Sequence, residues 1–533
     1  MIQTILVNGN IITLDERRPR VDALAISFGR VVALGADAAI RRLAGAGTAI
    51  VNLGGKTLLP GLVDAHLHWE AQARALRSVN VFEAPSKAQA LKRVEARVAQ
   101  TPAGEWITGQ GWAQDLWDDR AFPSNADLDA VSPLNPVYLS AKSGHAGWAN
   151  SAALAAAGIT DSTPDPEGGQ IARDASGAAT GILLETAMDL VEDCLPRPNP
   201  EQLADMMAEA QTLAHRSGLT MIHDFDEPSC LVALQILRER GQLGLRVVKQ
   251  VNQAWLDAAL DSGIRRNFGD DWLRIGALKL FADGALGPKT ALMFAPYDGE
   301  PDNLGMPVVD KEEMIELVSR ASASGLPSSI HAIGDKAVHD VLDVFERVRA
   351  EEAARGEPVS SRRHRIEHVQ IIHPLDAGRL ADLDVIASMQ PIHATSDMAT
   401  ADRYWGERNQ YAYNPRLQLD HGARIAFGSD APVEPFEPLL GIHAAVTRQR
   451  DRKPAGGWYP AAKISLQEAL LGFTRGPAYA AEMEDRLGML REGYLADLIV
   501  LDRDIYQAEP DEIPDLSVLG TMVGGVWRYR DFD

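Results

Sequence analysis

Two histidines separated by a single residue close the segment 58–68, which reads LLPGLVDAHLH. An apolar run punctuated by Pro-Gly is typical of a short buried strand. Side chains at positions i and i+2 of a strand point to the same face, so His66 and His68 should project together. Two neutral imidazoles side by side are suitable ligands for a divalent metal ion. The segment therefore indicates a metal site, although hydrogen-bonded histidines at a strand end would give the same pattern.

Further residues with chemical potential lie in later predicted strands. Lys279 sits inside the apolar run 276–281, where an unpaired ammonium group would be costly to bury. His331 and His368 end two predicted strands, and Asp430 ends the last one. Because the carboxyl ends of parallel strands share one edge of a sheet, these side chains should lie close together.

The elements that must position these residues alternate between strand and helix. Helical patterns at 201–217, 311–323 and 337–354 separate apolar, strand-like segments. Together with the strand at 58–68, the predicted strands are 219–225, 246–252, 275–283, 326–335, 362–370, 384–391 and 424–432. Eight strands alternating with helices predict an α/β fold, a (β/α)8 TIM-like barrel.

The two ends of the chain have a different pattern. Residues 1–57 read as short strands of a small antiparallel sheet, with hairpin signals at Asn8-Gly9 and Phe28-Gly29. Residues 480–533 add turns and strands, including a hairpin around Gly524-Gly525. We therefore expect one composite β-sandwich domain built from both termini.

The barrel itself should occupy residues 58–479, interrupted by an insertion at about 75–200. This gap between the first two strands is too long for one crossover. An insertion after a barrel strand lies over the face where active sites form, so it should act as a lid or substrate wall. A purely stabilising excursion is the alternative.

Charge and composition restrict the possible partners. The chain has 533 residues and a net charge of −22, which repels phosphate backbones and anionic lipid surfaces. We therefore expect a small-molecule substrate, no nucleic acid and no membrane. Two cysteines are too few for a disulfide framework, and neither a signal peptide nor an apolar span is evident. These features predict a cytoplasmic location.

The motifs together resemble the amidohydrolase superfamily of metal-dependent hydrolases, and more closely the branch containing N-substituted formamide deformylase. The resemblance covers nearly the whole chain. It is carried by PGLVDAHLH at 60–68, KLFADG at 279–284, HAIGD at 331–335, RIEH at 365–368, GSD at 428–430 and GYLAD at 493–497.

This resemblance implies two divalent metal ions held by His66, His68, Lys279, His331, His368 and Asp430. The first two histidines and the aspartate would hold one ion, and the other two histidines the second. Lys279, carboxylated on its amine, would bridge them, and Asp430 would be the catalytic general base and acid. Zinc suits this ligand set, and manganese or cobalt could also fill it. A single-metal site is the alternative.

Substrate contacts are predicted less directly. His145, between glycines in the insertion, could hydrogen-bond the substrate carbonyl or be a solvated loop histidine. Trp148 could belong to a substrate cage or to a packed core. His223 could line the pocket, more as a residue behind the metal ligands than as a ligand itself, and Asp283 should anchor a loop near the metals. Arg365 should form a structural salt bridge, because strand alternation turns it away from His368.

The resemblance implies hydrolysis of a carbon–nitrogen bond, an amide of a small amine. A cyclic amidase or an aminoheterocycle deaminase of the same superfamily is the alternative. Deaminases place a glutamate three residues after the histidine of strand five, where this chain has Gly334. A catalytically silent regulator is a third possibility, against which the complete ligand set argues. The family likeness also makes a homodimer possible.

Overall fold

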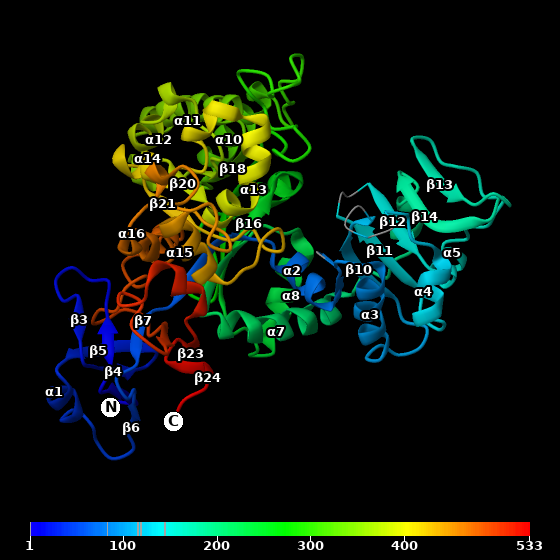
Figure 1. Ribbon diagram of the computed structural model, residues 1–533. Helices are drawn as coiled ribbons and strands as arrows, with labels where there is room; N and C mark the ends of the chain where they lie inside the picture. Colours follow the sequence, from blue (N-terminus) through cyan, green and yellow to red (C-terminus); the bar gives the residue numbers. More distant parts are fainter. Residues whose placement is uncertain (1, 83, 115–116, 118–119, 143–144) are drawn as a thin grey trace. The chain divides into compact units, whose positions relative to one another are not determined.

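The computed structural model describes residues 2–82, 84–114, 117, 120–142 and 145–533 (Figure 1). The chain divides into two compact units. The smaller unit spans Ala71–Met206, and the larger one combines the residues up to Glu70 with Met207–Asp533.

An eight-stranded parallel sheet forms the centre of the larger unit. Neighbours in sequence are neighbours in the sheet, in the order β8 (Leu62–Leu67), β15 (Leu219–Asp224), β16 (Arg246–Asn252), β17 (Leu273–Phe281), β18 (Ser328–Ala332), β19 (Arg365–His368), β20 (Ile386–Met389) and β21 (Ile425–Phe427). The sheet nearly closes beyond β21, where Asp430 N donates to His66 O at 2.7 Å and His68 N to Ala431 O at 2.8 Å. The predicted (β/α)8 barrel is confirmed.

Burial on both faces explains why the barrel strands are rich in apolar residues. Every residue of β8 and of β15 is buried, as expected for a parallel sheet covered by helices. Helix α11 (Asp335–Ala354) contributes Val341 and Phe345 to a core shared with Ile330 and Ile366 of the strands. Within the described part of the chain, no helix is both long and apolar enough to span a bilayer.

The expected first strand is in fact two strands, which separate at Gly61. Strand β7 (Thr57–Pro60) pairs antiparallel with β22 (Leu498–Leu501) in a terminal sheet, whereas β8 pairs with β15 in the barrel. A Cβ atom at Gly61 would lie 2.4 Å from the Cγ2 atom of Thr220. The chain can therefore turn from one sheet into the other here only with glycine.

Both termini build two further sheets. One has six strands, in the order β24 (Val526–Arg530), β23 (Val518–Val523), β22, β7, β2 (Asn10–Ile12) and β3 (Arg20–Val21). The other has the order β5 (Arg30–Gly35), β4 (Ala23–Ser27), β1 (Thr4–Val7) and β6 (Ala49–Asn52). Leu6 and Leu24 of the second sheet share a buried core with Leu58, Leu498 and Met522 of the first, as in a sandwich.

Two of the three expected terminal hairpins are present. The turns at Phe28-Gly29 and Gly524-Gly525 join the antiparallel pairs β4–β5 and β23–β24. The hairpin expected at Asn8-Gly9 is wrong, because β1 and β2 belong to different sheets. The N-terminal sheet is also not purely antiparallel, since β1 pairs parallel with β6.

The smaller unit has its own sheet and core. Its six strands follow the order β13 (Gly169–Arg173), β14 (Ala179–Glu185), β12 (Ala146–Ala149), β11 (Val137–Ala141), β10 (Ile107–Trp112) and β9 (Val79–Asn80). Helices α3 (Lys87–Val98) and α4 (Asn125–Val131) contribute Val94 and Leu128 to a core that also holds Trp112, Trp117 and Trp148.

Closure of the barrel depends on a second glycine. A Cβ atom at Gly428 would lie 2.5 Å from His66 N and 2.6 Å from Asp64 Oδ1. We expect the added Cβ atom of Gly428→Ala to push the end of β21 away from β8. This should lower the free energy of unfolding by about 1–3 kcal/mol, as overpacking does. Urea denaturation measures this, with Gly45→Ala, where a Cβ atom would meet nothing within 4 Å, as the control. Equal midpoints for the two variants would contradict the steric argument.

Candidate active site

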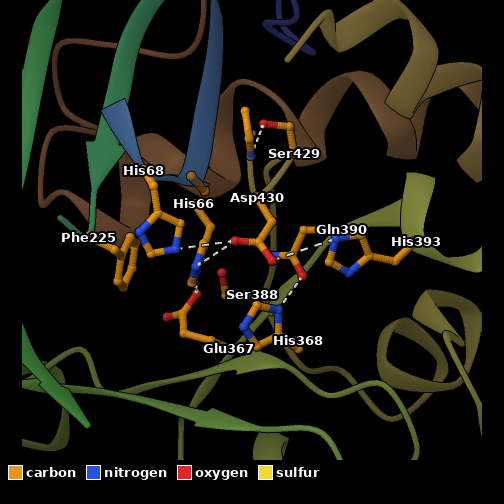
Figure 2. Close-up of polar contacts among 12 residues, drawn as sticks. His66, His68, Phe225, Glu367, His368, Ser388, Gln390, His393, Ser429 and Asp430 are labelled. Carbon is orange, nitrogen blue, oxygen red and sulfur yellow. Dashed lines mark hydrogen bonds and ion pairs between the residues drawn. The ribbon is translucent and has the colours of Figure 1, made fainter. Parts of the chain in front are cut away.

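One cavity of about 390 Å³ at the carboxyl ends of the barrel strands collects all six predicted metal ligands. Its lining includes His66, His68, Lys279, His331, His368 and Asp430. Figure 2 shows His66, His68, His368 and Asp430 pointing toward one another from separate segments of the barrel. The barrel thus brings together His66 and Asp430, which lie 364 positions apart in the chain, as their positions at strand ends predicted.

Asp430 lies at the centre of this group. Its Oδ1 atom is 3.4 Å from His66 Nε2 and 3.4 Å from His68 Nε2. His66, His368 and Asp430 each offer a ligand atom, and these atoms all lie within 4.8 Å of one another. Among the described residues, His66 Nε2 is buried and forms no hydrogen bond. A buried nitrogen without a partner beside a carboxylate fits a donor set for a divalent cation.

His66 is held in the form that can bind a metal. Its Nδ1 atom lies 2.6 Å from Glu367 Oε2, and Glu367 also accepts hydrogen bonds from Arg365 and Ser329. Burial would raise the pKa of Glu367, but Arg365 and His66 outweigh it and hold that pKa well below its usual range. Burial lowers the pKa of His66 to about 4. A neutral His66 therefore donates a hydrogen bond from Nδ1–H to Glu367 and presents the Nε2 lone pair to the cavity.

His68 is oriented by a carboxylate that follows β15. Its Nδ1 atom lies 3.3 Å from Asp226 Oδ1, and Asp226 Oδ2 accepts a hydrogen bond of 2.5 Å from Glu70 N. Burial would lower the pKa of His68, but Asp226 and Asp430 together raise it to about 9. Asp226 thus fixes the ring with Nε2 directed at Asp430.

We expect Asp226→Ala to weaken metal binding by about 10- to 100-fold, the usual effect of losing a carboxylate that orients a histidine ligand. Competition with a chromophoric chelator measures the affinity. Asp257→Ala is the matched control, because the Asp257 side chain is 75% exposed and pairs with Arg320. Equal metal affinities in the two variants would contradict an orienting role for Asp226.

His368 reaches the cavity through an unusual backbone conformation. Its φ angle is +75°, and that of Val369 is +43°. Strand alternation places Arg365 and Glu367 on one face and His368 on the other, so the left-handed turn at the strand end redirects His368. Its Nδ1 atom then lies 2.8 Å from Gln390 Oε1. His331, from the neighbouring strand, hydrogen-bonds Gly284 O through Nε2 at 2.9 Å.

Asp430 also has a left-handed conformation, with φ +63°. Its Oδ2 atom lies 3.7 Å from His393 Nε2. Burial would raise the pKa of Asp430, but the hydrogen bond from His68 and the neighbouring His66 and His368 hold it well below its usual range. The aspartate is therefore ionised in the resting site.

Lys279 is fully buried in β17, with no ion-pair partner among the residues that the structure describes. Its Nζ atom lies 4.9 Å from the centre of the Phe225 ring and 4.4 Å from that of Phe281. Burial lowers its pKa to about 8. At pH 7 about a tenth of the amine is therefore neutral and nucleophilic, far more than for an exposed lysine.

Several residues of the site were not anticipated from the sequence. His393 lines the cavity from the first turn of α13 (Pro391–Tyr404), and Phe225 stacks on His66 at 3.9 Å. His393 could have been found, because it lies two residues beyond the predicted strand 384–391. Glu367, inside the quoted RIEH motif, was overlooked because strand alternation turns it away from His368.

Two of the predicted substrate contacts lie in the smaller unit. His145 lines a cavity of about 530 Å³ within that unit, and its Nδ1 atom is 3.1 Å from Glu185 Oε2. Trp148 is fully buried, and its indole N–H donates to Ser124 O at 2.8 Å. It packs edge-on against Trp112, with ring centres 6.2 Å apart, so Trp148 is part of the unit's core.

The other two lie behind the cavity wall. His223 is fully buried and its Nδ1 atom lies 3.0 Å from Arg365 Nη1. Asp283 accepts hydrogen bonds from the backbone of Leu292 and Gly334 at 2.8 Å and of Ile333 at 3.0 Å. These contacts are those of a loop anchor, and Arg365 forms an ion pair with Glu367, as expected.

A parallel (β/α)8 barrel with histidines and an aspartate at its strand ends defines a metal-dependent barrel hydrolase. The chain belongs to the amidohydrolase family, whose sequence profile matches residues 49–529.

Full-length relatives agree with this assignment. The chain is 34% identical to Protein LONG AFTER FAR-RED 3 of Arabidopsis thaliana, over 98% of its own length and 91% of the relative. It is 30% identical to N-substituted formamide deformylase of Arthrobacter pascens, over 99% of both chains. The crystal structure of an uncharacterized metal-dependent hydrolase from Pyrococcus horikoshii is 29% identical, with a TM-score of 0.79 over 95% of this chain and 99% of that one.

Proposed function

We propose that the protein hydrolyses the carbon–nitrogen bond of a small-molecule amide, with Asp430 moving the proton. The observation that carries this proposal is the position of Asp430. One carboxylate oxygen lies 3.4 Å from two histidine nitrogens, and the other faces the cavity beside His393. Such an aspartate can bind a metal through Oδ1 and exchange a proton through Oδ2.

The six clustered side chains would hold two divalent ions, with zinc the best match and manganese or cobalt able to replace it. His66, His68 and Asp430 would hold the first, and His331 and His368 the second. When bound, the ions supply Lewis acidity, which lowers the pKa of a water molecule and polarises the substrate carbonyl.

Carboxylation of Lys279 would complete the ligand set. The neutral amine adds to the carbon of CO2, forming an N–C bond and losing one proton to give a carbamate anion. The pKa of about 8 makes this amine available near neutral pH. The product replaces a buried cation by an anion that two cations neutralise.

Asp430 would act twice in one turnover. Its ionised carboxylate takes the proton of the attacking water at Oδ2 as the water oxygen bonds to the amide carbon. It then gives this proton to the nitrogen as the C–N bond breaks, releasing an amine and a carboxylic acid. The reaction consumes one water and needs no oxidant or reductant.

A substrate panel tests the proposal. It contains N-substituted formamides, N-acyl amino acids, cyclic amides, aryl esters and aminoheterocycles, each incubated with metal-replete protein with and without a chelator. Chelator-sensitive release of amine from an acyclic amide is the expected result. Ring opening or ammonia release would instead identify a cyclic amidase or a deaminase, and no turnover at all with two bound metals would overturn the proposal.

A further inference from the structure

The cavity wall formed by α13 and by the loop after β21 carries two carboxylates that the proposed reaction does not use. Asp397 lies one helical turn beyond His393, so both side chains share a face of α13. Glu434 lies four residues beyond Asp430. Asp397, Glu434 and Ser396 line the same cavity as the predicted metal ligands.

These two carboxylates are poorly neutralised. Asp397 accepts a hydrogen bond of 2.8 Å from Tyr413 Oη, and it has no ion-pair partner within the described part of the chain. Glu434 faces Arg450 at 3.9 Å, and the Arg450 side chain is 47% exposed. Burial raises the pKa of Glu434 and the nearby Asp397 raises it further, although a hydrogen bond from Ser396 and the charge of Arg450 oppose this rise. The wall therefore holds two acidic groups against one partly exposed arginine, and a bound cation would favour the ionised form of both carboxyls.

A further polar group in the cavity lacks a partner. His393 Nε2 is buried and forms no hydrogen bond with any described residue. The ring is held from its other side, where Nδ1 lies 3.2 Å from Gln370 Nε2. A buried nitrogen fixed in this way, 3.7 Å from Asp430 Oδ2, points to a polar ligand in the cavity.

The remaining lining completes the chemical description of the ligand. Phe281, Leu286, Pro288 and Ile333 form an apolar portion beside the metal ligands. The cavity thus combines a reactive group of histidines and aspartate, an apolar surface, and an acidic wall. Its volume of about 390 Å³ is that of a small-molecule site.

We propose that the substrate carries a positively charged nitrogen in addition to its amide nitrogen, and that Asp397 and Glu434 bind this cation. The inference rests on the proposed amide hydrolysis and names its substrate class: cationic amides. The charge can belong to the amine part, as in a mono-acylated diamine, or to the acyl part. Amides that carry a carboxylate, such as N-acyl amino acids, are repelled by the same wall.

Two isosteric pairs of substrates test this inference. In the first, the N-formyl derivative of 2-(trimethylammonio)ethylamine is compared with that of 3,3-dimethylbutylamine, so that a nitrogen cation replaces a neutral carbon. The second pair places the same exchange in the acyl part and thereby locates the charge. We expect the cationic member of one pair to have a kcat/KM about tenfold or more higher, mainly through KM.

The variants Asp397→Asn and Glu434→Gln keep the shape of each side chain and remove its charge. Each should reduce the preference for the cation several-fold, and the double variant should abolish it. Glu437→Gln is the matched control, because it changes the net charge equally at an exposed position outside the cavity. This control should keep the full preference.

The outcomes separate the two proposals. If all members are hydrolysed and neither cation is preferred, the cation inference is overturned while amide hydrolysis stands. If none is hydrolysed, amide hydrolysis fails for this set, and calorimetric titration of the metal-loaded protein with the same pairs decides the inference. Tighter binding of the cation, lost in the double variant, supports it, whereas equal binding or none overturns it.

Discussion

Asp430→Asn is expected to lower kcat by about 10²- to 10⁴-fold, because it removes the group that accepts and returns the proton. The structure makes this a clean substitution. Asp430 has a φ angle of +63°, and asparagine is one of the few residues that adopt this conformation readily. The backbone bond from Asp430 N to His66 O does not involve the side chain and is retained.

Initial-rate product assays at saturating substrate measure this effect, and the metal content is determined on the same samples. KM should change little if substrate binding precedes proton transfer. Asp382→Asn is a suitable control, since it makes the same chemical change at an exposed helix end. Near-normal turnover of Asp430→Asn with full metal content would assign the proton transfer to another residue.

The barrel could be predicted from sequence because its strands obey a simple rule. Parallel strands buried on both faces are rich in apolar residues, so segments such as 384–391 were recognisable, and β20 lies inside that range. The strand ends then indicated where His331 and Asp430 must lie. Fold and candidate ligands followed from one regularity, the common edge at which barrel strands end.

The features that sequence did not predict depend on tertiary contacts. The left-handed backbone at His368 breaks the strand alternation that would otherwise set the direction of its side chain. Nothing in the local sequence requires this conformation, since neither His368 nor Val369 is a glycine. The Asn8-Gly9 hairpin failed for a similar reason. Asn-Gly does mark a turn there, with φ +55° at Asn8, but the following strand pairs with β7 rather than with β1.

The carboxylates that orient the candidate metal-binding histidines could not be predicted from the local sequence either. Asp226 and Glu367 contact histidines that lie far away in sequence, so their roles appear only when the barrel brings β8 beside β15 and lets Glu367 of β19 reach His66. His393 lies in the first turn of a helix, two residues beyond the predicted strand 384–391, and its place just past a strand end is the sequence signal that indicates it.

Lys279→Ala is expected to lose bound metal and activity together, because no other anion of the described site occupies the bridging position proposed for the carbamate. The shortened side chain leaves space for a small carboxylate, so formate or acetate should restore part of both. Metal analysis and turnover, with and without added carboxylate, measure the two effects. Full metal occupancy without added carboxylate would rule out a bridging lysine.

Lys279→Met separates the role of the amine from the role of the side-chain volume. Methionine fills the space beside Phe225 and Phe281, so this variant should lose metal and activity and should not be rescued by carboxylates. It should nevertheless resist urea at least as well as the metal-free parent, because it replaces a buried amine whose charged form the fold disfavours. A metal-poor, inactive but stable protein would show that Lys279 is present for its chemistry, whereas loss of stability would make it a structural residue.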